Sequence, residues 1–362
     1  MNNKSKNNIL IAEFTESHTE LIHSQILFLL KNNYNITLWL NSDAEFEDKY
    51  SGKVKIIREG TKISSLNIGL LYKIVRYIQR NKIKKLVLNT AHGLLARNLC
   101  LLLINSKVEV IGVIHQAHKL LKSSNQKIIS RKIKKYFVLN DYIKTYIDFT
   151  TQNFYNVGVF YPIFFNKPEE KLIEKSDKVI ITIPGEVQQM RKDYIFLIEQ
   201  IFKLKKEIRE KFEFVFLGCA SKQKSSDILE LLDKNKQIED SIKIFKKHVA
   251  ENEFNSYIQN SDFIMPLIHP SSKSYNEYLT TEISGAFNTA FAFKKPMLMY
   301  NSFKQFDDFK NFSTFYNENN FIDILTALID NNSSEVLIKN YDSYKKFDFD
   351  FQAENYIKFI ES

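Results

Sequence analysis

Short apolar runs of strand length alternate with amphipathic helical patterns along this chain. Helical spacing of apolar residues is clear at residues 68–80 and 92–104. The apolar runs are continuous, which is typical of parallel strands covered by helices on both faces. In the first half they occupy residues 8–14, 35–40, 53–57, 85–89, 108–114 and 136–139. The alternation predicts an α/β fold built on a parallel sheet.

The second half repeats this scheme after a charged, proline-containing stretch at residues 166–176. Its strand patterns lie at residues 178–183, 212–217, 241–245, 263–267 and 296–300. A chain of 362 residues is long enough for two domains. We therefore predict one domain over residues 1–165, a second over residues 166–340, and a terminal helix at residues 343–360.

Charge is distributed unevenly between these halves. Residues 1–165 carry a net charge of +13 and residues 166–362 a net charge of −4, within a total of +9. This asymmetry favours an anionic partner for the first domain alone. No nucleic-acid-binding motif is present, so the partner we expect is an anionic membrane surface and not a nucleic acid.

The apolar runs also indicate where the protein works. The longest are shorter than a membrane-spanning helix, and the first is shorter than the apolar core of a signal peptide. Cys100 and Cys219 lack metal-ligand spacing and are predicted to be buried thiols. These features predict a cytoplasmic protein without a metal site.

Ligands of open parallel sheets bind beyond the carboxyl ends of the strands. Four of the seven histidines follow three predicted strands at this position, together with two carboxylates. Such side chains can act as general bases or position a substrate. The candidate residues are Glu13, Glu16, His18, His92, His115 and His118.

In the second half, residues 275–296 combine a polar loop with a helix that begins near Ser284 and Gly285 and stops before Pro296. The first N–H groups of a helix bind anions, and a glycine there lets a phosphate approach the backbone. The simpler interpretation is that Ser284 is an N-cap and Gly285 a packing glycine. An anion site and a structural cap are both compatible with this stretch.

The order of these parts resembles the donor-binding end of the large retaining family of GT-B-fold glycosyltransferases. The matching motifs are E-I-S-G at residues 282–285, K-P at residues 295–296 and S-D-F-I-M-P at residues 261–266. One feature departs from the family: its second acidic residue would fall at Ala290, or at Thr289 with one deletion.

The resemblance implies two doubly wound Rossmann-like domains that face each other across a cleft. The first would bind the acceptor and the second the nucleotide-activated donor, while residues 341–362 would cross back to the first domain. The implied activity is a hexosyl or related transfer from a nucleotide sugar to a glycan or a lipid-linked acceptor, in bacterial surface polysaccharide biosynthesis.

The resemblance also implies roles for individual residues. Catalytic roles are implied for Glu282, His115, His18 and Glu16, and acceptor-side positions for Glu13, His92 and His118. The implied donor-binding residues are Gly185, Arg191, Lys192, Gly218, His248, Ser284 and Gly285. No metal or other cofactor is expected, because helix N–H groups and Arg191 can neutralise the diphosphate.

Some alternatives remain open at this stage. A retaining enzyme would use Glu282 at the donor sugar, and an inverting one would take a base from His18, Glu16 or Glu13. A noncatalytic subunit that binds a partner enzyme or a glycan, and a nucleotide-sugar epimerase, are the rival functions. A basic, apolar-edged segment at residues 119–135 is expected to face the membrane's inner surface through Lys127, Arg131, Lys132, Lys134 and Lys135.

Overall fold

The computed structural model describes residues 7–16, 18–44, 46, 49–50, 52–59, 67–165, 173–330 and 333–362. The chain divides into two compact units. The N-terminal unit comprises Met1–Asn166, Thr280–Ile283 and Lys346–Ser362, and the C-terminal unit comprises Lys167–Leu279 and Ser284–Lys345. The predicted boundary stretch at residues 166–176 lies largely outside the described residues.

The N-terminal unit is built on a seven-stranded parallel sheet in the order β3-β2-β1-β4-β5-β6-β7. The strands are β1 (Asn8–Glu13), β2 (Asn35–Asn41), β3 (Val54–Glu59), β4 (Lys85–Leu88), β5 (Glu109–Val113), β6 (Lys135–Val138) and β7 (Asn156–Val159). β1 and β4 are neighbours, so the chain reverses its winding direction between them. This reversal creates the topological switch point at which doubly wound sheets bind ligands.

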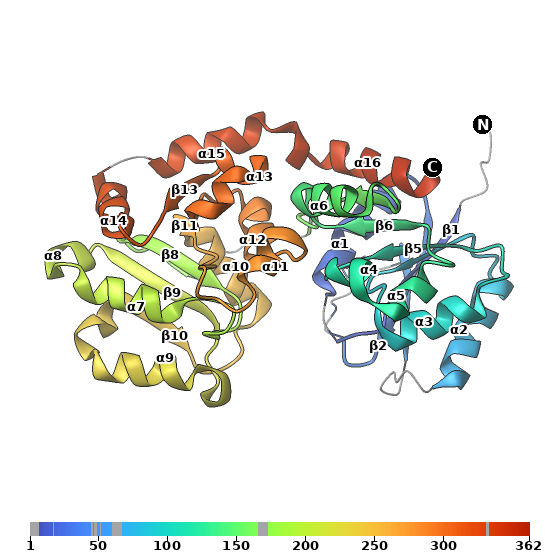
Figure 1. Ribbon diagram of the computed structural model, residues 1–362, viewed down its shortest axis with the longest axis horizontal. Helices are drawn as coiled ribbons and strands as arrows, with labels where there is room; N and C mark the ends of the chain where they lie inside the picture. The colour runs from blue at the N-terminus through green and yellow to red at the C-terminus, as the bar shows by residue number, and fades with distance from the viewer. Residues whose placement is uncertain are drawn as a thin grey trace. The chain divides into compact units, whose positions relative to one another are not determined.

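Helices cover both faces of this sheet (Figure 1). They are α1 (Glu20–Lys31), α2 (Ile68–Arg80), α3 (Gly93–Leu102), α4 (His118–Lys122), α5 (Ser124–Ile129), α6 (Asp141–Thr151) and α16 (Phe349–Glu361). Alternate strand residues such as Ile9, Ile11 and Phe137 share one core with α1 and α16. Successive side chains of a strand point to opposite faces of the sheet, so every second apolar residue of these strands packs against α1 and α16.

The last helix, α16, is drawn in red within the blue-to-green N-terminal unit (Figure 1). The Tyr356 ring stacks on Phe137 with centroids 4.6 Å apart. Phe359 lies over Gly158 of β7, where an added Cβ would come within 2.8 Å of the ring. The absence of a side chain at Gly158 therefore lets α16 approach the sheet.

The C-terminal unit contains a six-stranded parallel sheet in the order β10-β9-β8-β11-β12-β13. Its strands are β8 (Val179–Pro184), β9 (Phe212–Cys219), β10 (Ile242–Phe245), β11 (Phe263–Ile264), β12 (Met297–Tyr300) and β13 (Ser313–Tyr316). Its helices are α7 (Tyr194–Lys203), α8 (Lys206–Arg209), α9 (Lys222–Lys234), α10 (Glu251–Asn260), α11 (Tyr275–Thr280), α12 (Gly285–Phe293), α13 (Asp307–Lys310), α14 (Phe321–Asp330) and α15 (Ser333–Ser343). The prediction of two doubly wound α/β domains is confirmed.

Several local predictions need correction. The helix expected at residues 343–360 begins later, at Phe349, because the Asp348 carboxylate caps its start by accepting hydrogen bonds from the Asp350 and Phe351 N–H groups. The short helix α11 and the edge strands β7 and β13 were not predicted. Cys100 is buried as expected, whereas Cys219 at the end of β9 is partly exposed.

Among the described residues, no helix combines the length and apolarity that crossing a membrane requires.

Candidate active site

Four histidines gather at the carboxyl ends of β1, β4 and β5 in the N-terminal unit. The rings of His18 and His115 stack with their centroids 3.8 Å apart and their planes 19° from parallel. His92 Nδ1 accepts a hydrogen bond from Lys119 Nζ at 3.2 Å. His118 Nδ1 lies 3.8 Å from a carboxylate oxygen of Glu282. The topology thus brings together histidines that are up to 100 residues apart in the sequence.

Glu13 lies beneath this cluster and is fully buried. Its carboxylate accepts hydrogen bonds from the Thr15 N–H and hydroxyl at 2.7 Å each, from Asn89 Nδ2 at 2.7 Å and from the Thr90 hydroxyl at 2.8 Å. Burial raises the pKa of Glu13, and these hydrogen bonds oppose the rise. The geometry does not fit the acceptor-side role expected for Glu13, because the carboxylate has no exposed surface. Glu16, in contrast, is exposed.

His115 is also buried, and its Nε2 lies 2.7 Å from the Asn89 carbonyl oxygen. A carbonyl can only accept, so Nε2 carries the hydrogen and Nδ1 retains a lone pair. Burial holds the pKa of His115 well below its ordinary value, and the nearby His18 lowers it further. His115 is therefore neutral at physiological pH. Its stacked partner His18 is half-buried and has a left-handed backbone with φ of 70°.

His92 is neutral for a related reason. Burial lowers the pKa of His92 to about 4, and the Lys119 ammonium group contributes to the same effect. A neutral Nδ1 is the acceptor that the Lys119 ammonium group requires. Burial also lowers the pKa of Lys119, while the charge of Glu282 opposes this change. Lys119 thus belongs to the cluster, although the sequence indicated it only as part of a basic segment.

Glu282 is positioned against the same cluster by its backbone. It forms an antiparallel bridge with Gln116, and the Ala117 N–H donates to the Thr281 carbonyl at 2.9 Å. The Tyr142 hydroxyl donates to the Glu282 carbonyl at 2.8 Å. Residues 280–283 are consequently part of the N-terminal unit. The sequence placed Glu282 in a donor-binding motif, and nothing in that motif indicated its proximity to His118 and Lys119.

In the C-terminal unit, Ser284 is the N-cap of α12, and its hydroxyl accepts a hydrogen bond from the Ala286 N–H at 3.4 Å. The next residue, Gly285, is exposed, and a Cβ added there would meet nothing within 4 Å. The first turn of α12 therefore combines a capped start with unobstructed backbone. Ala290, where the family's second carboxylate was expected, is fully buried in the same helix.

The loop after β8 is shaped by two glycines. Gly185 has φ of +101°, which favours glycine, and Gly218 near the end of β9 packs directly on its backbone. A Cβ at Gly218 would lie 2.2 Å from the Gly185 carbonyl oxygen, so no other residue fits without backbone movement. Gly218 thus brings the ends of β8 and β9 together.

The two basic residues of this loop differ in their surroundings. Arg191 is exposed, whereas Lys192 is buried and donates to the Pro184 carbonyl. Burial lowers the pKa of Lys192 to about 7, and the neighbouring Arg191 adds to this effect. Only Arg191 has the exposure that direct contact with a ligand requires. His248, in the loop after β10, is also exposed.

A buried network next to this loop was not predicted. Asp193 is the N-cap of α7 and accepts hydrogen bonds from Phe196 N–H, Gln189 and Ser271. His269 Nδ1 lies 3.4 Å from the same carboxylate, and its Nε2 lies 2.7 Å from the Tyr316 hydroxyl. Burial favours a higher pKa for Asp193, but these hydrogen bonds together hold it well below its usual range. Only the position of His269 after a strand could have indicated this network.

The basic segment at residues 119–135 divides into separate elements. Ser123 ends α4 and caps α5 by accepting from the Gln126 N–H. Lys135 belongs to β6 and forms an ion pair with Glu109 at 2.7 Å, while Lys132 donates to the Ser106 carbonyl at 2.8 Å. Lys135 is thus not the surface cation that we expected. Lys127, Arg131 and Lys134 are exposed.

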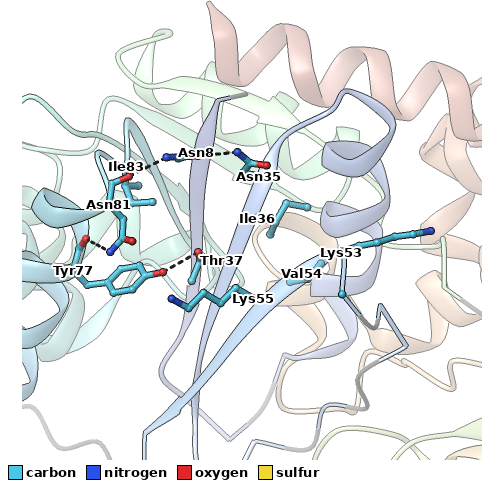
Figure 2. A pocket seen from close by; sticks show the side chains of 11 residues that line it. Asn8, Asn35, Ile36, Thr37, Lys53, Val54, Lys55, Tyr77, Asn81 and Ile83 are labelled. Carbon is cyan, nitrogen blue, oxygen red and sulfur yellow. Dashed lines mark hydrogen bonds between the residues drawn. The ribbon is translucent and has the colours of Figure 1, made fainter. Parts of the chain in front are cut away.

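A polar hollow of about 360 Å³ lies at the opposite end of the N-terminal sheet (Figure 2). Its lining comes from the amino ends of the first three strands and from the end of α2. The hydroxyl groups of Tyr77 and Thr37 share a hydrogen bond of 3.2 Å there, and the Asn8 side-chain amide donates to the Asn81 carbonyl at 2.9 Å. The hollow lies away from the carboxyl ends of the strands, where the histidines gather.

No protein-family model and no curated protein sequence matches this chain. Solved structures match it over almost its whole length. A glycosyltransferase from Rickettsia africae is 15% identical with a TM-score of 0.68, over 98% of this chain and 97% of that one. HepE from Anabaena, solved with UDP and glucose, is 11% identical with a TM-score of 0.69, over 98% and 99% of the two chains.

A protein from Listeria monocytogenes assigned as a UDP-N-acetylglucosamine 2-epimerase is 11% identical with a TM-score of 0.63, over 99% of this chain and 96% of that one. Identities this low show the fold alone. The structures that resemble this chain include GT-B glycosyltransferases with two Rossmann-like domains, and both sheets of this protein have the corresponding parallel topology. The chain therefore has the GT-B fold.

Proposed function

We propose that this protein is a glycosyltransferase that moves a sugar from a nucleotide-activated donor to a glycan or lipid-linked acceptor in bacterial surface polysaccharide synthesis. The observation that carries the proposal is the cluster formed by His18, His92, His115, His118 and Glu282 in a chain of GT-B fold. HepE, which shares this fold over its whole length, was solved with UDP and glucose.

The C-terminal unit would hold the donor. The exposed backbone at Gly285 offers the N–H groups of α12 to a phosphate, and Arg191 supplies an exposed guanidinium group. As the sugar leaves, negative charge builds on the diphosphate, and fixed N–H groups and a cation stabilise it. The proposed reaction needs no metal for this purpose, so chelators should leave turnover unchanged.

The N-terminal unit would hold the acceptor. An inverting reaction needs a base at the acceptor hydroxyl, and His18 is the best candidate because its ring is half-exposed. Glu13 is a poor candidate, since its carboxylate is buried and accepts four hydrogen bonds. A retaining reaction would instead use Glu282 beside the donor sugar. The configuration of the product, measured by NMR, decides between these courses.

Turnover of common nucleotide sugars by the purified protein tests this function. Glu282→Ala and Arg191→Ala should each lower kcat/KM by about 100-fold or more, as expected for groups that stabilise charge in the transition state. The control is Glu277→Ala, which removes an exposed carboxylate from α11. A protein whose thermal unfolding is insensitive to every nucleotide tested, and which turns over none of the sugars, would contradict the proposal.

Two specific observations support other functions. The similarity to the Listeria monocytogenes structure favours an epimerase, which would convert UDP-N-acetylglucosamine without any acceptor. The buried alanine at position 290 favours a noncatalytic subunit, which would bind a glycan or partner without turnover. An epimerase would convert UDP-N-acetylglucosamine in an assay without acceptor, whereas a transferase requires the acceptor. A noncatalytic subunit would show no turnover, and its Glu282→Ala variant would still bind glycans.

We also propose that the N-terminal unit docks on the inner face of the plasma membrane from the cytoplasm. Helix α3 packs against α5, and Leu101, Leu102 and Ile104 are exposed apolar side chains at and just after the end of α3. Exposed cations on and after α5 are Lys127, Arg131 and Lys134. We call these six residues the α3–α5 patch. Each cation near an anionic leaflet is worth about 1 kcal/mol, so three give reversible, salt-sensitive attachment.

Cosedimentation with anionic vesicles tests this docking. Changing all three cations of the α3–α5 patch to Gln should lower vesicle binding by about tenfold or more at physiological salt. The matched control changes three exposed lysines of the C-terminal unit, Lys205, Lys222 and Lys236, to Gln. Equal binding to neutral and anionic vesicles would contradict the proposal.

A further inference from the structure

Asn89 follows β4 and lies fully buried beneath the two stacked histidines. Its side-chain Nδ2 donates to Glu13 Oε2 at 2.7 Å and to the His18 carbonyl at 2.8 Å. Its Oδ1 accepts from Gln25 Nε2 at 2.7 Å. Its backbone carbonyl accepts from His115 Nε2. One residue therefore contacts both histidines of the stack and the buried carboxylate below them.

The surroundings of Asn89 determine how its amide is oriented. A carboxylate and a backbone carbonyl can only accept, so the NH2 group must face Glu13 and His18. Oδ1 then faces the NH2 group of Gln25. Glu13, Gln25 and Asn89 are fully buried, so any of their polar groups left without a partner would cost about 1–3 kcal/mol. An amide is the side chain that matches two acceptors on one side and a donor on the other.

These bonds act on the two histidines in different ways. The bond to the His18 carbonyl stabilises a left-handed conformation that is uncommon for any residue except glycine. The Asn89 carbonyl directs the hydrogen of His115 to Nε2. The backbone of one histidine and the tautomer of the other thus depend on the same residue.

The chain of hydrogen bonds continues to the C-terminal helix. Gln25 of α1 accepts at Oε1 from the Tyr356 hydroxyl of α16 at 3.0 Å. Tyr356 is fully buried. A residue close to the end of the chain therefore orients Gln25, which in turn orients Asn89.

We propose that Asn89 is a positioning residue for His18 and His115, and that Tyr356 of α16 acts on the same pair through Gln25. The effect on turnover rests on the proposed glycosyltransferase function, whereas the effect on the two imidazoles does not. An experiment can therefore contradict the positioning role of Asn89 and the glycosyltransferase function independently of each other.

Asn89→Asp is the sharpest variant because it keeps the shape of the side chain. An oxygen would replace the NH2 group that faces Glu13 Oε2, and two carboxylates this close share one proton. At acid pH that proton restores a donor between them, and at higher pH they repel each other. The groups that face the new carboxylate are Glu13, His18 and Gln25, with His115 on the backbone carbonyl and Tyr356 beyond Gln25.

The experiment records long-range proton–nitrogen NMR spectra of the histidine rings in the full-length protein between pH 5 and 8. Wild type should show His115 as the Nε2–H tautomer throughout. In Asn89→Asp the His18 and His115 signals should move as pH rises, and kcat should fall at least tenfold above pH 7 with partial recovery at pH 5. The donor KM should change less than threefold, since the C-terminal unit is untouched.

Tyr356→Phe provides a second, milder test if Asn89→Asp does not fold. It should shift the signals of the same two histidines and lower kcat by about threefold to tenfold. Its matched control is Tyr34→Phe, which removes another hydroxyl bond to α16, to Glu361 at 2.7 Å, outside this network. Unchanged histidine signals in Asn89→Asp, or equal effects of Tyr356→Phe and Tyr34→Phe, would overturn the proposal. Shifted signals in a protein without transferase activity would support it and contradict only the proposed function.

Discussion

The carboxyl edges of the two sheets differ, although both sheets have the same kind of parallel topology. In the N-terminal unit, the edge presents four imidazoles and the Glu282 carboxylate, and the buried Asn89 bonds to Glu13, His18 and His115. In the C-terminal unit, the edge presents backbone, with Gly185 and Gly218 in contact and Gly285 open. One edge therefore supplies side chains that can transfer protons, and the other supplies N–H groups suited to phosphate.

The largest effect expected from this difference is at Gly218. The Gly218→Ala substitution places a Cβ 2.2 Å from the Gly185 carbonyl oxygen. The clash can be relieved only if the backbone of β9 moves away from the backbone at Gly185. We expect the free energy of unfolding of the C-terminal unit to fall by about 3 kcal/mol or more, as in severe overpacking. Hydrogen exchange of β8 and β9 amides, measured together with denaturant unfolding, reports this loss.

The matched control is Gly285→Ala, because the added Cβ there would meet no atom within 4 Å. This change should alter stability by about 0.5 kcal/mol or less. Equal losses for the two glycine variants would show that close backbone contact is not what organises this edge.

A second prediction concerns Asp193. Like Glu13 in the N-terminal unit, it is a buried carboxylate that accepts several hydrogen bonds. Asp193→Asn should lower the free energy of unfolding at pH 7 by about 1–3 kcal/mol, because the carboxylate accepts several buried hydrogen bonds. The pKa of Asp193 is lower in the folded than in the unfolded chain. Its contribution is therefore complete above about pH 4 and disappears as pH falls through the folded pKa.

Denaturant unfolding at pH 7 and at pH 3 checks this dependence. The difference between wild type and Asp193→Asn should be smaller at pH 3. Asp233→Asn serves as the control, since Asp233 is exposed on α9. A difference that does not depend on pH would contradict an ionised, hydrogen-bonded Asp193.

The smallest effect concerns the charge of the N-terminal edge. His92 should titrate in NMR spectra at about pH 4, since burial and Lys119 both disfavour its protonation. The unfolded chain binds this proton near pH 6.5, so the free energy of unfolding of the N-terminal unit should fall as pH drops from 6.5 to 4. A midpoint near 6.5 would show that this edge is not kept neutral.

Lys119→Met measures how much the Lys119 ammonium group contributes to the low pKa of His92. It removes the ammonium group beside His92 while it keeps an apolar side chain of similar length. The His92 pKa should rise but stay below 6.5, because burial remains. An unchanged titration would assign the whole shift to burial.

Much of this molecule follows from local sequence patterns. Continuous apolar runs located eleven of the strands approximately, and the histidines after them were expected at one edge because carboxyl ends of parallel strands meet there. The start of α12 at Gly285 was also expected from its N-cap serine. Periodicity and capping are properties of neighbouring residues, so one sequence is enough to recognise them.

Contacts between distant residues were not predictable in this way. Nothing local shows that Glu282 lies beside His118, that Asp193 meets His269, or that Tyr356 reaches Gln25. Burial cannot be predicted from the local sequence either. Glu13 and Lys192 were expected to contact ligands, and both side chains are buried. Both properties depend on how whole elements pack.

The position of α16 has a consequence for how the protein is made. Its residues, 349–361, follow every strand of the C-terminal unit in the sequence and complete the apolar core of the unit that contains β1. A chain emerging from the ribosome exposes Phe137 and the α1 face until α16 has been synthesised, and by then the C-terminal unit already has all its strands. Domains that form during translation usually do so in order from the N-terminus. Here the unit that begins first is completed only after the strands of the C-terminal unit, so its incomplete core is the surface that chaperones would meet.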